Sequence, residues 1–110
     1  MTAEDMTRLM DINLNDTLKA LSNPVRLDIM HWLKDPCRHF PHLNTDLEET
    51  GVSVSIIQAK AQLSQSTISS YLALLSRAHL VTSHRSGGWT YYKRNEKAVE
   101  CFIQQLSTMM

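Results

Sequence analysis

The residues from Ser64 to Ser70 carry the side chains best suited to recognising another molecule through hydrogen bonds. This stretch contains four serines, one threonine and one glutamine. Each hydroxyl can donate or accept a hydrogen bond, and a glutamine amide can form two hydrogen bonds with the edge of an adenine. The chemistry that these residue types favour is therefore recognition of nucleic acid bases and phosphates.

A helix over residues 64–77 would separate the side chains into two faces, because successive residues turn by about 100°. One face would be polar and free of acids, and it would consist of Gln65, Ser66, Ser69, Ser70, Ala73, Ser76 and Arg77. The other would be largely apolar, and it would consist of Thr67, Ile68, Tyr71, Leu72, Leu74, Leu75 and Ala78. Serine is a poor choice for an ordinary solvated helix face, so the polar face indicates a surface that lies against DNA. A solvated face without a partner is the alternative interpretation.

Acidic residues are absent from the whole segment 50–95, although the chain carries 11 basic and 11 acidic residues and has no net charge. The basic residues and histidines of this segment are Lys60, Arg77, Arg85, Lys93, Arg94, His79 and His84. A surface built from the segment can present only positive charge, which is the pattern of a protein that binds a polyanion. Chance clustering of the charges is the alternative.

Capping residues and prolines predict two helices at the start of the chain. Apolar residues at helical spacing predict a first helix that begins near Glu4 or at Asn13 and ends at Leu21. A second helix is predicted to follow an N-cap at Asn23. It ends before Pro36, because the residue before a proline avoids the helical conformation.

The next elements are expected to position the polar face. Residues 35–54 are predicted to form a long loop, and residues 55–62 a short helix. A tight turn at Leu63 and an N-cap at Ser64 then lead into the polar-faced helix. Two helices joined by about three residues, the second longer and polar-faced, form a helix-turn-helix.

Residues 81–85 and 89–93 predict a β-hairpin, since β-branched and aromatic residues flank a glycine pair at 87–88. Its arms carry Arg85 and Lys93, and Gly87 lies at a tip that can approach a DNA backbone closely. A hairpin directly after a recognition helix is the wing of a winged helix. Three aromatic residues are predicted to brace this wing against the helices rather than to stack on bases: Trp89, Tyr91 and Tyr92.

A last helix is predicted from Glu96 to about Met109, with one apolar stripe. The stripe consists of Val99, Phe102, Ile103, Leu106 and Met110. This apolar stripe has to be buried against another surface, which could be the first helix or a second subunit. The predicted fold class is mainly α with a small β-hairpin (α+β), a winged helix-turn-helix.

Residues 17–100 resemble the ArsR/SmtB family of dimeric winged-helix transcriptional repressors. The matching segments are Leu18-Lys-Ala-Leu-Ser-Asn-Pro-Val-Arg-Leu27, Leu63-Ser-Gln-Ser-Thr-Ile-Ser69, Leu72-x-Leu-Leu75, Leu80-Val81 and Tyr91-Tyr92. The resemblance implies a homodimer joined through the first and last helices. It also implies that two recognition helices enter successive major grooves of a near-palindromic double-stranded DNA operator, while wing residues near Arg85 reach a minor groove or the backbone.

Ten residues are predicted to contact DNA when the resemblance is combined with the charge and turn patterns. They are Ser64, Gln65, Ser66, Thr67, Ser69, Ser70, Arg77, Arg85, Gly87 and Lys93. The sequence departs from the family at two positions of the recognition helix. Members of the family commonly have Arg-His before the leucine of this helix, whereas this chain has Ser70 and Tyr71 before Leu72. Gly88 likewise replaces an arginine that is common near the wing tip. These changes remove positive charge, so they put the base preference and the affinity in question.

The sensory sites familiar in the family are absent from this sequence. Ser53-Val54-Ser55 stands where metal sensors carry Cys-Val-Cys, the last helix has acids but no histidine, and two cysteines cannot supply an arsenite site. Two ideas stay open. One is a thiol switch between Cys37 and Cys101, and the other is a loop metal site formed by Cys37, His39 and His42. Structural roles for both cysteines are the simpler alternative, so no metal or cofactor is assigned and the inducer is unknown.

The function that the sequence predicts is a sequence-specific, homodimeric transcriptional repressor. A winged-helix module that binds another protein is the alternative from a different class. An enzyme is not expected, because the chain has no phosphate-binding glycine loop and no catalytic motif. We expect a single domain over residues 1–110, with residues 1–12 as a flexible or helical extension. We also expect a cytoplasmic location without membrane contact, since no secretory signal or membrane-length apolar run is present.

Overall fold

The computed structural model describes residues 13–41, 43 and 46–110. Its first two helices are α2 (Leu14–Leu21) and α3 (Pro24–Lys34). Asn13 caps α2 by accepting hydrogen bonds from two backbone N–H groups, and Asn23 caps α3 in the same way. These caps and both helix ends confirm the predictions. The alternative start near Glu4 and the extension over residues 1–12 lie outside the described residues.

The segment 35–54 is not a loop, so that prediction was wrong. It contains two single-turn helices, α4 (Pro36–His39) and α5 (Leu47–Thr50), followed by the short strand β1 (Val52–Ser53). Pro36 starts α4, and the Asp46 carboxylate accepts a hydrogen bond from the Glu49 N–H to cap α5. Phe40 and Leu47 are buried in the core, where they anchor the two turns.

The helix-turn-helix consists of α6 (Val54–Ala61) and α7 (Gln65–Arg77). The predicted short helix over 55–62 is therefore displaced by one residue at each end. Gln62 adopts the left-handed conformation with φ of 57° and ends α6. Ser64 then caps α7, as predicted, because its hydroxyl accepts a hydrogen bond from the Thr67 N–H.

The sheet has three antiparallel strands in the order β1-β3-β2, where β2 is Val81–Ser86 and β3 is Trp89–Arg94. The predicted hairpin is confirmed, and β1 adds a third strand that the sequence did not indicate. In the β2–β3 register Arg85 lies opposite Thr90, and in the β1–β3 register Val52 lies opposite Tyr92. Strand β1 therefore joins the base of the wing to the helical core.

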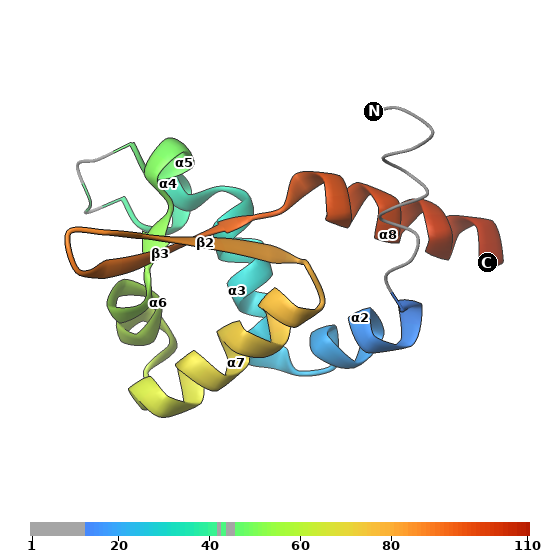
Figure 1. Ribbon diagram of the computed structural model, residues 1–110, viewed down its shortest axis with the longest axis horizontal. Coiled ribbons are helices and arrows are strands. Elements are labelled where there is room, and N and C mark those ends of the chain that lie inside the picture. Colours follow the sequence, from blue (N-terminus) through green and yellow to red (C-terminus); the bar gives the residue numbers. More distant parts are fainter. Residues whose placement is uncertain (1–12, 42, 44–45) are drawn as a thin grey trace.

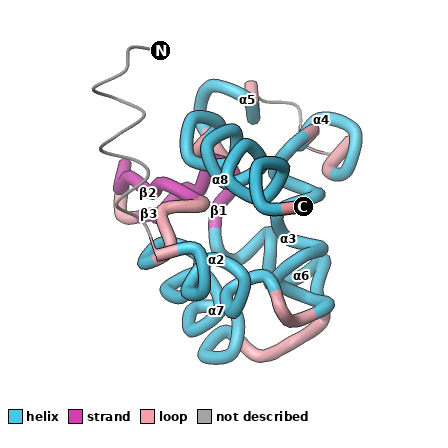
Figure 2. The backbone as a smooth tube through the Cα atoms, turned by 90° about the vertical axis from the view of Figure 1, so that its right-hand side faces the viewer, coloured by secondary structure: helices cyan, strands magenta, loops and turns pink. Residues whose placement is uncertain are grey.

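The chain closes with α8 (Glu96–Met109), capped by Asn95 and matching the predicted range. Figure 1 shows α2 and α8 at the end of the molecule opposite the hairpin tip, and Figure 2, viewed from that end, shows both helices toward the viewer. The predicted α8 stripe is only partly covered: Val99 is buried, whereas Ile103 and Met110 are 57% and 94% exposed. Within the described residues, no helix is long and apolar enough to cross a membrane.

Gly51 is required where α5 turns into β1. Its φ of 88° and ψ of −179° belong to a region that only glycine adopts easily. A Cβ atom at this position would lie 2.8 Å from the Tyr92 carbonyl oxygen and 2.9 Å from Cγ of Lys93. The backbones of β1 and β3 can therefore approach as closely as they do only because residue 51 has no side chain.

Gly51→Ala is expected to lower the free energy of unfolding by at least about 1–3 kcal/mol, from backbone strain alone. The contact with the Tyr92 carbonyl oxygen adds to this loss. Gly88→Ala is the matched control, because Gly88 also has a positive φ, of 82°, but a Cβ there would meet nothing within 4 Å. Urea unfolding followed by circular dichroism measures both variants. Equal losses would show that the close approach of β1 and β3 contributes nothing.

Candidate nucleic-acid interface

The outer face of α7 is the exposed polar surface that the sequence indicated. Gln65, Ser66, Ser69, Ser70 and Arg77 are all exposed, together with Ala73 between them. Ala73 is the only apolar side chain on this face, so the face offers no apolar patch to another protein. Short hydroxyls leave the helix backbone accessible, so the face can lie close to a groove or a phosphate.

The first turn of α7 separates capping groups from contact groups. The Ser64 hydroxyl accepts from the Thr67 N–H at 3.2 Å and donates to the Thr67 Oγ1 at 2.8 Å. Thr67 is half-buried. Ser64 and Thr67 therefore fix the start of the helix, while Gln65 and Ser66 are exposed, although the Ser66 hydroxyl also lies 3.2 Å from the Ser64 hydroxyl. The N–H groups at the first turn of a helix also attract phosphate.

The buried face of α7 holds the outer face in place. Ile68, Leu72 and Leu75 have no measurable exposure, and each such side chain stabilises the fold by about 1.5–3 kcal/mol. Between the two faces, the Tyr71 hydroxyl accepts a weak 3.5 Å hydrogen bond from the Asn23 side chain, and the Arg26 guanidinium lies 5.0 Å from the centre of the Tyr71 ring. Tyr71 therefore ties α7 to the start of α3.

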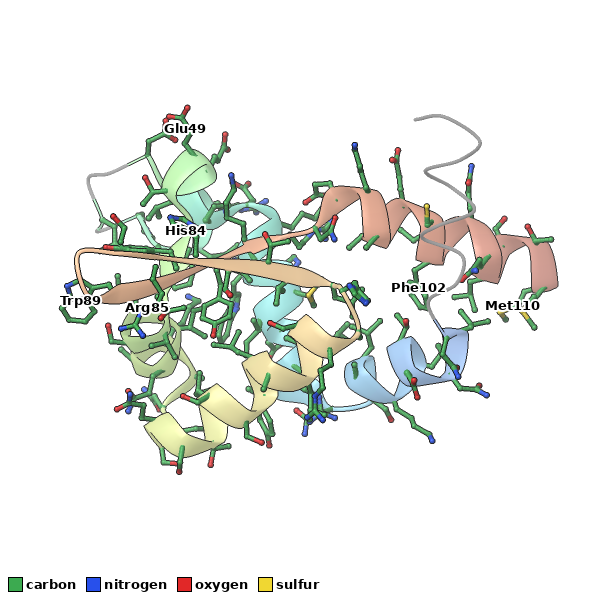
Figure 3. The ribbon with its side chains drawn as sticks, viewed as in Figure 1. Glu49, His84, Arg85, Trp89, Phe102 and Met110 are labelled. Atoms are coloured by element: carbon green, nitrogen blue, oxygen red, sulfur yellow. The ribbon has the colours of Figure 1, made fainter. Side chains whose placement is uncertain are left out.

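The two basic residues of the wing lie on opposite sides of the hairpin. Side chains alternate along a strand, and cross-strand partners share a side. The register therefore places Arg85 with Thr90, and Lys93 with Tyr91 and His84. Figure 3 shows Arg85 on the side of the hairpin that faces α6 and α7, and His84 on the side that faces α4 and α5. Arg85 thus shares a side with the recognition helix, and Lys93 does not.

The three aromatic residues of the wing do not all brace it. Tyr92 is half-buried and packs against the core, and the Tyr91 ring stacks on His84 with 5.5 Å between centroids. Trp89, however, is 54% exposed at the outer end of the hairpin (Figure 3). The bracing role predicted for Trp89 was therefore wrong, because β3 extends past the helices that cover its other end.

Two of the basic residues in the acid-free segment already bind other groups of the protein. The Lys60 ammonium donates to the His39 carbonyl oxygen at 3.0 Å and lies 5.3 Å from the centre of the Trp32 ring. Arg94 forms two 2.8 Å hydrogen bonds with the Glu96 carboxylate. These bonds lower the pKa of Glu96 and so favour its ionised form. Lys60 and Arg94 are therefore poor candidates for phosphate contacts.

The two cysteines lie in different environments. Cys37 is exposed on α4, whereas Cys101 is 2% exposed on the inner side of α8. Burial raises the pKa of the Cys101 thiol, and Glu100 raises it further, so the reactive thiolate is disfavoured at neutral pH. A thiol switch between these residues stays a prediction, and it requires α8 to move enough to expose Cys101.

The loop metal site is only partly within the described structure. His42 lies outside the described residues, and no group of three or more His, Cys, Asp or Glu side chains able to hold a metal occurs within them. The His39 ring lies 4.7 Å from the His31 ring, and partial burial together with the charges of His31 and Lys60 lowers the pKa of His39. The loop metal site also stays a prediction.

The geometry defines a class of protein: a helix-turn-helix with an exposed polar second helix, followed by an antiparallel wing, is a winged helix-turn-helix domain. No family model matches the chain. A curated protein of Bacillus subtilis (strain 168), described as an uncharacterized HTH-type transcriptional regulator, YbzH, is 51% identical over 94 residues, which cover 84% of this chain and 94% of that protein. The chain therefore belongs to the helix-turn-helix transcriptional regulators.

Solved structures share the fold. An ArsR-like transcriptional regulator from Rhodococcus sp. RHA1 has a TM-score of 0.66 at 20% identity, over 87% of this chain and 77% of that chain. A homodimeric winged helix-turn-helix DNA-binding domain from Mycobacterium bovis, described as a possible ArsR-family regulator, has a TM-score of 0.61 at 22% identity, over 97% and 87% of the two chains. The fold expected from the ArsR/SmtB resemblance is confirmed.

Proposed function

We propose that the protein is a homodimeric repressor that binds a near-palindromic site in double-stranded DNA. The observation that carries this proposal is the exposed, acid-free polar face of α7 on the same side of the wing as Arg85. This face can enter a major groove, while the wing reaches the neighbouring backbone or minor groove. A repressor acts by occupying its operator, so the DNA-binding surface alone is sufficient for repression.

The proposed DNA contacts divide into base contacts and backbone contacts. Gln65, Ser66, Ser69 and Ser70, which are exposed on α7, are proposed to contact base edges. Gly87 and Arg85 in the wing and Arg77 at the end of α7 are placed for phosphates. Ser64 and Thr67 act through the helix cap, and Lys93 faces the other side of the hairpin. Trp89 alternates onto the same side of the hairpin as Lys93, so it is not added to the contact set.

The proposed dimer uses α2 and α8. Four large apolar side chains are 40–94% exposed in one protomer: Leu18 on α2, Ile103 and Met109 on α8, and Met110 directly after α8. Exposed apolar groups concentrated at one end of a molecule indicate an interface. The Mycobacterium bovis neighbour is described as homodimeric, which supports a dimer. A dimer presents two copies of α7, which is why a near-palindromic operator is expected.

Substitutions at Gln65 and Arg85 test the proposal, because their effects on sequence preference should differ. Gln65→Ala should weaken binding to the operator by about 1–3 kcal/mol and relax base preference at one position. Arg85→Ala should weaken binding to all sequences alike and should reduce the slope of affinity against salt concentration. Fluorescence anisotropy with the promoter DNA of the protein's own gene and with scrambled DNA, across a salt series, measures both effects.

Lys60→Ala is the control for this experiment. Lys60 is a basic residue of the same segment, but its ammonium is bound to the His39 carbonyl oxygen. Its removal should leave the salt slope unchanged. If neither Gln65→Ala nor Arg85→Ala alters DNA binding, the assigned surface is wrong. Absence of DNA binding by the unsubstituted protein would instead favour a winged helix that binds another protein.

A further inference from the structure

A cavity of about 670 Å³ lies at the base of the wing, apart from the proposed DNA surface. It is partly open to solvent and is lined by the end of α3, the start of α4, α5, the three strands and the first turn of α8, which meet in the upper part of Figure 1. Its volume falls within the range of small-molecule sites. Arg85 and the outer face of α7 do not contribute to it.

The cavity combines an apolar floor with a basic rim. Leu33, Leu47 and Val52 form the floor, and each is at most 6% exposed. The rim carries four basic residues and two acidic residues: Lys34, Lys93, Arg94, Lys97, Glu48 and Glu96. Two positive charges therefore remain after the acids are subtracted. An apolar floor with a few convergent charged groups is the usual composition of a site for an organic ion.

Three of the rim cations form no salt bridge with the described residues, although the charge of Lys34 also acts on the Glu96 carboxylate. Arg94 and Glu96 satisfy each other through two 2.8 Å hydrogen bonds, which form the one salt bridge within the described part of the chain. Lys34, Lys93 and Lys97 form none with the described residues. They come from three different elements, α3, β3 and α8. An anion in the cavity could accept hydrogen bonds from all three ammonium groups at once.

We propose that this cavity binds a small organic dianion, a phosphate monoester or a dicarboxylate attached to an apolar body. The charged group accepts hydrogen bonds from Lys34, Lys93 and Lys97, and the apolar body lies on Leu33, Leu47 and Val52. Charge-assisted hydrogen bonds supply the specificity for an anion. Because β3 also carries the wing, the bound ligand links α3 and α8 to the strand that extends toward DNA.

Titration of the ¹⁵N-labelled full-length protein with phenyl phosphate or phthalate, followed by NMR, tests the site without DNA. Saturable shifts are expected at the amides of Lys34, Val52 and residues 93–97, and none at residues 65–70. Benzyl alcohol has the apolar body without the charge and should not bind. Inorganic phosphate has the charge without the body and should bind more weakly. The two dianions also distinguish a phosphate ligand from a carboxylate ligand.

The double variant Lys34→Gln/Lys97→Gln should bind the better dianion at least about tenfold more weakly, because two charge-assisted hydrogen bonds are lost. Both lysines are exposed, and the thermal unfolding midpoint of the variant confirms folding. Lys19→Gln, on α2, removes an exposed lysine elsewhere and should leave the affinity unchanged.

Three results would overturn the proposal: no saturable shift with either dianion, equal binding of benzyl alcohol, or unchanged affinity in the double variant. Because no DNA is present, such a result leaves the proposed DNA binding untouched. Failure of the DNA-binding experiment likewise leaves this site standing.

Discussion

Ile103→Arg is expected to convert the proposed dimer into a monomer and to weaken operator binding by about 100-fold or more, since linking two DNA-binding units multiplies their affinity by this order. Ile103 lies on α8 and is 57% exposed, so its side chain contributes to an intermolecular face rather than to the protomer core. An arginine there would have to be desolvated in an apolar interface without a partner. A monomer presents only one α7 to the operator.

Size-exclusion chromatography with light scattering measures the mass of the variant, and fluorescence anisotropy measures its affinity for the operator. Gln104→Arg is the matched control, because it adds the same charge at the next position of α8, about 100° around the helix, where the side chain is polar and exposed. Gln104→Arg should remain dimeric. If Ile103→Arg remains a dimer, α8 is not the interface. If it becomes a monomer with unchanged affinity, one protomer is sufficient for binding.

The helices could be predicted from the sequence because their boundaries depend on local chemistry. Asn13, Asn23, Ser64 and Asn95 each cap a helix through a side-chain oxygen that accepts a backbone N–H within three residues. Capping residues followed by an apolar stripe indicate a helix without knowledge of the rest of the fold. The helix-turn-helix and its polar face followed from such local signals.

The segment 35–54 could not be predicted in the same way, since its structure depends on contacts between residues distant in sequence. The single turns α4 and α5 are too short to show helical periodicity, and they persist because Phe40 and Leu47 are buried in the core. Strand β1 has two residues, and it forms because Val52 and Ser53 pair with Tyr92 and Tyr91. A strand of this length has no recognisable alternation in sequence.

The candidate site was predicted in part. The outer face of α7 follows from a helical period, and the structure exposes it as expected. The faces of the wing depend on the register of β2 and β3, and a shift of one residue exchanges the two sides. Sequence alone therefore could not place Arg85 and Lys93 on opposite sides of the hairpin. The residue type of Trp89 likewise does not indicate whether its side chain is buried or exposed. The cavity that contains Lys93 is lined by residues of seven helices and strands, and it had no sequence signal.

Ser69→Glu is expected to weaken binding to any DNA sequence by about 100-fold or more, because a carboxylate facing a phosphate or a base acceptor costs several kcal/mol. Ser69 is exposed on the outer face of α7, so the substitution should leave the free energy of unfolding nearly unchanged. The dimer carries the substitution twice, once for each half-site. Anisotropy with operator and scrambled DNA, alongside urea unfolding, measures the two quantities.

Thr50→Glu separates the effect of position from the effect of net charge. Thr50 is an exposed residue of α5, on the other side of the hairpin from α7 (Figure 1), and the substitution changes the net charge by the same amount. It should alter DNA affinity only slightly, because charges farther away than about 10 Å are screened by salt. Ser69→Ala removes the hydroxyl without adding charge, and it should cost only about 1 kcal/mol. Equal losses for Thr50→Glu and Ser69→Glu would mean that DNA responds to the total charge of the protein, and the outer face of α7 would then lose its assignment as the recognition surface.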